Sequence, residues 1–183
     1  MVWLLKKLLC ILLAFLIGLN PLPALAWSEG GHPIIALMAS DLLNKEEQAK
    51  FLATLEKHPR YKEDFAPPAK LPNDTEVTRC RVGRAGYWPD VARRQPKFHR
   101  STWHYELGPA LTIGNLKTPT RPGPLPANAT LDTQALHISQ AIELCRNTLK
   151  GTSPAEDKAL ALCWMAHLGR RCLPAMPRGQ PLR

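Results

Sequence analysis

The chain has 183 residues, of which 24 are Lys or Arg and 15 are Asp or Glu, so its formal net charge is +9. Its length suits one domain with a substantial core, and the basic balance suits an anionic partner such as nucleic acid or a phospholipid head group. Plain solubility explains the charge equally well. None of the five cysteines stands in a C-x-x-C pair, which excludes the common cysteine-held zinc sites.

The first 26 residues have the pattern of a cleaved export signal. They combine a basic start, an apolar run and small residues before the cleavage point, at Lys6 and Lys7, at 8–17, and at Ala24 and Ala26. A run of this length cannot span ~30 Å of hydrocarbon as a helix, so we expect export and no stable membrane anchor. The signal alone leaves periplasmic and secreted destinations open.

Cleavage after Ala26 makes Trp27 the mature N-terminus and leaves 157 residues. The signal contains two of the 24 basic residues and none of the 15 acidic residues. The net charge of the mature chain is therefore (24 − 2) − 15 = +7. The α-amine of Trp27 loses its proton readily to a metal and, with the carbonyl of the same residue, can form a chelate. His32 is a candidate third ligand. Four cysteines remain and allow two disulfides of undetermined pairing.

The apolar pattern predicts an all-α domain over residues 27–168. Helices are expected at 32–43, from Asn44 to Pro59, at 85–94, at 131–149 and from Ser153 to 168. We expect a surface loop at 59–75, an extended segment at 97–107 and an irregular connection at 108–130. Residues 169–183 continue neither a helix nor a strand and form an aberrant tail.

Two short motifs place a potential zinc ligand beside large aromatic residues. They are Trp88-Pro89-Asp90 and Trp103-His104-Tyr105. Zinc accepts carboxylate and imidazole donors, and an apolar environment fixes them in place. For Trp88 and Trp103 by themselves, ordinary core packing is the favoured interpretation. His167 lies on the apolar face of its predicted helix, so it is either a hydrogen-bonded core residue or a ligand.

Taken together, these features resemble the S-one/P-one nucleases, exported zinc enzymes that cut single-stranded DNA and RNA and share a fold with bacterial phospholipase C. The resemblance covers about residues 27–168. It consists of the N-terminal Trp27 with His32 five residues on, the two aromatic motifs, and the late segment Leu-Cys-Trp-Met-Ala-His-Leu that contains His167.

The resemblance implies three zinc ions at the base of a cleft in a mostly helical domain. Trp27 and His32 would hold one ion, and the second would be held by Asp90, His104 and His167. As a ligand of ions that activate water for attack on phosphorus, Asp90 would be a catalytic residue. In this chain at most one or two of the three sites are partly present.

The sequence departs from the family pattern after residue 168. Arg171 stands where the family has an aspartate that bridges two ions, and its charge opposes metal binding. Codons compatible with Gly169 to Arg183, read one base later, can encode the missing Asp and a following Gln-Pro-x-His. We infer a frameshift near codon 169, which the coding DNA tests. The resulting chain is expected to be impaired in catalysis. It is also expected to be poorly stable, because the inner face of its last helix would lack packing partners.

The leading hypothesis is therefore an exported zinc-dependent nuclease with single-stranded DNA or RNA as its substrate. A zinc phospholipase C is the alternative enzyme, and a non-catalytic exported nucleic-acid-binding protein is the alternative outside enzymes. Six basic residues around Asp90 favour a polyanion over a single lipid head group: Arg79, Arg81, Arg84, Arg93, Arg94 and Lys97. A solvated basic face explains them equally well.

Overall fold

The computed structural model describes residues 31–106 and 123–169. The predicted signal peptide, Trp27, Cys172 and the tail beyond Gly169 lie outside the described residues, as does most of the predicted connection at 108–130. Predictions about these segments stay predictions.

Within the described residues the chain is helical and contains no strand, which confirms the predicted all-α class. The α-helices are α2 (Gly31–Asp41), α3 (Lys45–Leu55), α4 (Tyr61–Asp64), α5 (Asp74–Ala92), α6 (Ile138–Lys150) and α7 (Ala155–Leu168). Two short 3-10 helices, η2 (Pro96–Phe98) and η3 (Ser101–His104), follow α5. No helix in this part of the chain is long and apolar enough to cross a membrane.

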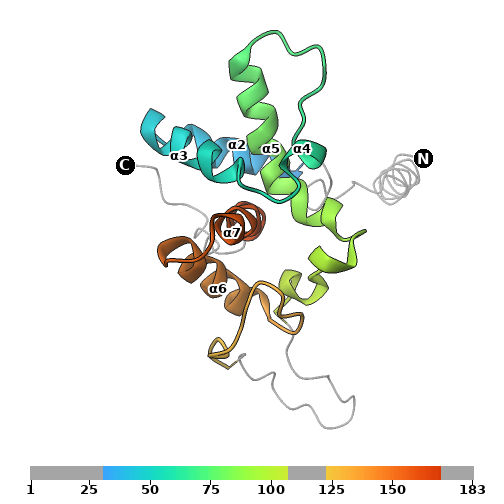
Figure 1. Cartoon of the computed structure of the whole chain (residues 1–183), viewed down its shortest axis with the longest axis vertical. Coiled ribbons are helices and arrows are strands. Elements are labelled where there is room, and N and C mark those ends of the chain that lie inside the picture. The colour runs from blue at the N-terminus through green and yellow to red at the C-terminus, as the bar shows by residue number, and fades with distance from the viewer. Residues whose placement is uncertain (1–30, 107–122, 170–183) are drawn as a thin grey trace, which may run out of the picture.

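The helix α7 lies near the middle of the molecule and is seen almost end-on in Figure 1. It packs against α5 and α6, with α3 and α2 as further neighbours, while α5 also packs along α2. One core cluster joins α6, α7 and η3 around Trp103 and Trp164, whose ring centroids are 4.8 Å apart. A second joins α3, α5, η2 and α7 around Trp88. Both clusters therefore fix the position of α7.

The predicted helix starts are confirmed best at α3. The side chain of Asn44 accepts a hydrogen bond from the Glu47 backbone N–H, and Glu47 accepts one from the Asn44 N–H, each at 2.9 Å. This reciprocal pair is the predicted capping box. At α7 the helix begins at Ala155 without a side-chain cap, so the predicted capping role of Ser153 is wrong.

The predicted extended segment at 97–107 is wrong, because it contains η2 and η3. The predicted helix from 131 is also wrong before Ile138, where α6 begins. The late start of α6 has a structural cause. Side chains of the 3-10 region bind the backbone carbonyls of 131–134, which are then lost to a helix: Arg100 bonds to Leu131, Thr102 to Gln134 and Trp103 to Thr133.

The predicted loop at 59–75 contains the single turn α4, and the predicted helix at 85–94 is the end of a much longer one. Helix α5 has 19 residues and begins at Asp74, with Asn73 as its N-cap. Gly83, Gly86 and Pro89 weaken the helical pattern of the sequence, although packing against α2 and α7 stabilises the helix.

One face of α2 is uncovered in the described part of the chain. This face carries large apolar side chains that are exposed, with Ile34 at 59%, Met38 at 63% and Leu42 at 87%. An apolar groove of about 790 Å³ runs beside this stripe between α2, α3 and α7, and Leu162 and Met165 line it from α7.

His58 is a buried histidine outside the metal candidates, and its titration gives a first prediction. Burial lowers the pKa of His58 from 6.5 to about 4. Between these two pH values the unfolded chain binds a proton at this site that the folded chain does not. The contribution of His58 to the free energy of unfolding is therefore fully present above pH 6.5 and is lost as the pH falls toward 4.

We expect the free energy of unfolding of the metal-free protein to fall by about 2 kcal/mol more in wild type than in a His58→Asn variant between pH 7 and pH 4.5. Asparagine retains an acceptor for the Arg60 N–H that now bonds to His58 Nδ1. Urea unfolding with a chelator at each pH measures the difference. If the free energy of unfolding of the two proteins changed equally with pH, the lowered pKa of His58 would be contradicted.

Candidate metal centre

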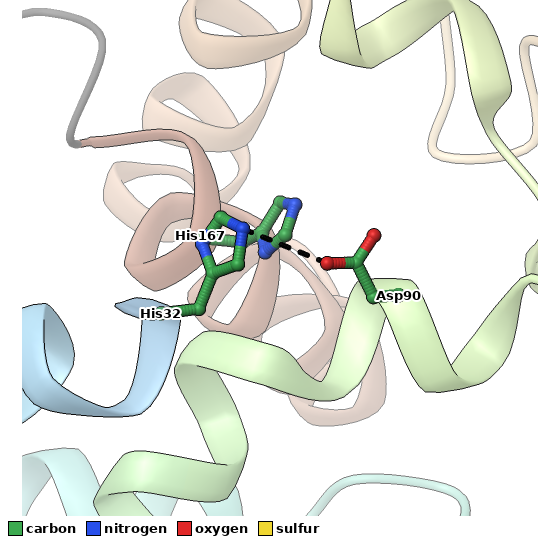
Figure 2. Close-up of side chains that lie close together, drawn as sticks. All are labelled: His32, Asp90 and His167. Carbon is green, nitrogen blue, oxygen red and sulfur yellow. Dashed lines mark ion pairs between the residues drawn. The ribbon is translucent and has the colours of Figure 1, made fainter. Parts of the chain in front are cut away.

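Three candidate ligands from separate helices point toward one another, as Figure 2 shows. His32 lies in the first turn of α2, Asp90 near the end of α5 and His167 in the last turn of α7. Their ligand atoms all lie within 4.8 Å of one another. The close packing of α2 and α7 on α5 therefore brings together residues that are distant in the sequence.

The two carboxylate oxygens of Asp90 face different histidines. Oδ2 lies 3.6 Å from His32 Nε2, and Oδ1 lies 3.7 Å from His104 Nε2. Two donors at ~2.1 Å from a tetrahedral zinc ion stand roughly 3.4 Å apart. Each pair therefore has about the spacing of two ligands of one ion.

Backbone carbonyls orient the histidine rings. Nδ1 of His167 lies 2.9 Å from the carbonyl oxygen of Gly86. Nδ1 of His104 lies 3.2 Å from the carbonyl oxygens of both Arg100 and Ser101. A carbonyl accepts only from a protonated nitrogen, so Nδ1 carries the hydrogen in each neutral ring. Nε2 then keeps the lone pair that a metal requires.

Burial also favours the metal-binding form of these rings. It lowers the pKa of His167, and the neighbouring His32 lowers it further. Burial likewise lowers the pKa of His104, with the positive charge of Arg93 as a second cause. Both imidazoles are therefore neutral at neutral pH, and metal binding need not displace a proton from them.

The donor set fits zinc. It consists of imidazole nitrogens and one carboxylate, which are common zinc ligands, and each of the two buried rings is oriented by a backbone carbonyl. Trp164 packs edge-on to His104 at a centroid distance of 5.5 Å. Trp88 and Trp103 are buried at 2% and 0% exposure, so the core interpretation of both residues is confirmed.

Four of the five predicted ligands lie in this cluster, namely His32, Asp90, His104 and His167. In the predicted grouping His32 and Asp90 hold different ions, whereas in the structure the two side chains approach each other directly. The rings of His32 and His167 are stacked 4.1 Å apart. Trp27 lies outside the described residues, and the ligand role of all five residues stays a prediction.

Arg93 is one of the six basic residues predicted around Asp90, and its contacts distinguish it from the others. Its Nη2 lies 3.0 Å from Asp90 Oδ1, and its side chain is 44% exposed. Its position three residues after Asp90 places both residues on one face at the end of α5. Arg93 is thus an exposed cation in contact with the candidate metal ligand.

Other predicted basic residues of α5 contact the protein scaffold. Arg79 pairs with Asp41 at 3.1 Å, and Arg81 lies over the ring of Tyr61. Arg84 donates to the carbonyl oxygens of Asp64 and Ala66. These contacts tie the first part of α5 to α2 and to the α4 region, so Arg93 is better placed than these three to meet a substrate at Asp90.

Comparisons with known proteins identify no relative. No protein-family model matches the chain, and no curated protein or solved structure matches it. The functional interpretation therefore depends on the geometry of the cluster and on the sequence motifs.

Proposed function

We propose that the protein is an exported zinc-dependent phosphodiesterase that acts on single-stranded nucleic acid. The observation that carries the proposal is the position of the Asp90 carboxylate between His32 and His104, with His167 in the same cluster. Three histidines around one carboxylate, all buried or half-buried, are a common set of ligands for zinc.

The residues present divide into ligands and substrate-binding groups. His32, Asp90, His104 and His167 would hold zinc, which activates water and polarises a phosphoryl oxygen when bound. Once Asp90 contacts a metal, the guanidinium of Arg93 is available for a phosphate oxygen of the substrate, because its side chain already reaches the solvent. Since Arg171 replaces the bridging aspartate of the resembled family, we expect slow turnover in this chain.

Tyr105 is suited to binding a base of a single-stranded nucleic acid. The residue directly follows His104, its side chain is 47% exposed, and its ring centroid lies 6.2 Å from that of His104. An exposed aromatic ring beside a phosphate site is suited to stacking with an unpaired base.

Replacing Tyr105 with alanine is expected to weaken zinc-dependent binding of a labelled single-stranded oligonucleotide about tenfold, the amount lost with one stacked base. Tyr105→Phe retains the ring and is expected to bind within twofold of wild type. Fluorescence anisotropy with zinc and with a chelator measures both. Equal binding by wild type and Tyr105→Ala would contradict the stacking role, and preference for phosphatidylcholine vesicles would favour the phospholipase alternative.

A further inference from the structure

Pro89 interrupts the hydrogen bonding of α5 immediately before Asp90. Proline has no N–H, so the helical bond from this position to the carbonyl of Ala85 is missing. The helix backbone therefore fixes the last turn of α5 less firmly than an uninterrupted helix would. Besides the direct contacts of the Asp90 carboxylate with Arg93, His32 and His104, contacts that hold the backbone near Pro89 are then needed to fix this turn.

Two such contacts are made by residues just before Pro89. The carbonyl oxygen of Gly86 is bonded to His167. The indole Nε1 of Trp88, the residue next to Pro89, donates to Asp64 Oδ2 at 2.9 Å. Trp88 is also enclosed by aromatic rings, with centroid distances of 4.3 Å to His58 and 5.3 Å to Phe98.

Asp64 is itself held rigidly. Arg60 donates to both carboxylate oxygens of Asp64, from Nε at 2.8 Å and from Nη2 at 2.9 Å. The Asp64 side chain is only 12% exposed. Burial alone would raise the pKa of Asp64, but the hydrogen bonds from Arg60 and Trp88 outweigh burial and hold it below its usual range. Asp64 is thus a fixed, charged acceptor for the indole N–H.

We propose that Asp64 is a positioning residue for Asp90 and acts through the Trp88 side chain. Its carboxylate fixes the indole two residues before Asp90 and so compensates for the hydrogen bond that Pro89 removes. The consequence for zinc affinity rests on the proposed function, whereas the ordering of the last turn of α5 does not. Asp64 itself touches neither the metal candidates nor the substrate side of the cluster.

Two variants of the full chain test this role. Asp64→Ala removes the acceptor, and Trp88→Phe removes the indole N–H but keeps an aromatic ring and the Arg60–Asp64 pair. Asp41→Ala is the matched control, because it breaks the ion pair of Asp41 with Arg79 at the other end of α5. Thermal unfolding establishes a temperature at which all four proteins are folded.

The first measurement is amide hydrogen exchange in the metal-free proteins. We expect both variants to accelerate exchange at residues 90–92 about tenfold relative to the amides of α6, while Asp41→Ala changes this ratio less than twofold. Uniform acceleration over the whole chain, or none at residues 90–92, would mean that Asp64 contributes only to general stability and would overturn the proposal.

The second measurement is zinc affinity by competition with a chromophoric chelator. Asp64→Ala and Trp88→Phe are expected to bind about tenfold more weakly than wild type, the effect typical of groups that orient metal ligands. Unchanged affinity in both would contradict the link to Asp90. If wild type binds no zinc, the proposed function fails and hydrogen exchange alone decides the positioning role.

Discussion

Replacing Asp90 with asparagine is expected to weaken zinc binding by more than about 100-fold and to abolish zinc-dependent hydrolysis. Losing a residue that merely orients a ligand typically costs 10–100-fold in affinity, and Asp90 is the candidate ligand itself. Its two oxygens face His32 and His104. The amide of asparagine has the same shape but no charge, so the variant tests the carboxylate and leaves the packing of α5 intact.

The control for this variant is Asp41→Asn. It removes an exposed carboxylate of α2 that pairs with Arg79, a residue of the same helix as Asp90. We expect its zinc affinity to remain within twofold of wild type. Isothermal titration of the metal-free proteins with zinc measures both variants. Equal affinities in wild type and Asp90→Asn would show that the carboxylate is no ligand, and the metal assignment would then be wrong.

Replacing Gly86 with alanine is expected to destabilise the protein by about 3 kcal/mol and to weaken zinc binding at least tenfold. The new Cβ would lie 2.6 Å from the Cβ of Ala36 and 3.0 Å from the carbonyl oxygen of His32. Neither atom can rotate away, so α2 must move off α5. This movement displaces His32 and also disturbs the carbonyl that orients His167.

Gly83→Ala provides the matched control one turn earlier in α5. Its new Cβ would lie 3.3 Å from the Cβ of Pro33, so Pro33 would have to shift by only a few tenths of an ångström. Within a helix, alanine is intrinsically favoured over glycine by ~1 kcal/mol. We therefore expect little change in stability and unchanged zinc affinity in this variant. Similar urea midpoints for the two alanine variants would contradict the close packing of α2 and α5 at Gly86.

The sequence predicts the elements whose signals are local. The Asn44–Glu47 box and the buried stripe of α7 follow from short spacings, and the structure confirms both. It does not predict α5 at its full length, because Gly83, Gly86 and Pro89 are poor helix formers. Their presence is explained only by packing, where glycine permits close contact with α2.

The candidate site shows a similar division. The sequence suggests four of its residues by different signals: His32 by its position after Trp27, Asp90 and His104 by their aromatic neighbours, and His167 by its helix face, with the family resemblance joining them into one set. Local spacing could not show that Asp90 lies between His32 and His104, because that relation depends on how α2, α5 and η3 pack. The contacts of Arg93 with Asp90 and of Asp64 with Trp88 also become visible only in three dimensions.

The zinc content of the exported product, measured by native mass spectrometry together with its intact mass, tests the central proposal most directly. We predict a chain that begins at Trp27 and carries at least one tightly bound zinc ion, which the Asp90→Asn variant lacks. A folded product that contains no zinc, or that binds equal zinc in wild type and Asp90→Asn, would contradict the proposal that this cluster is a metal centre.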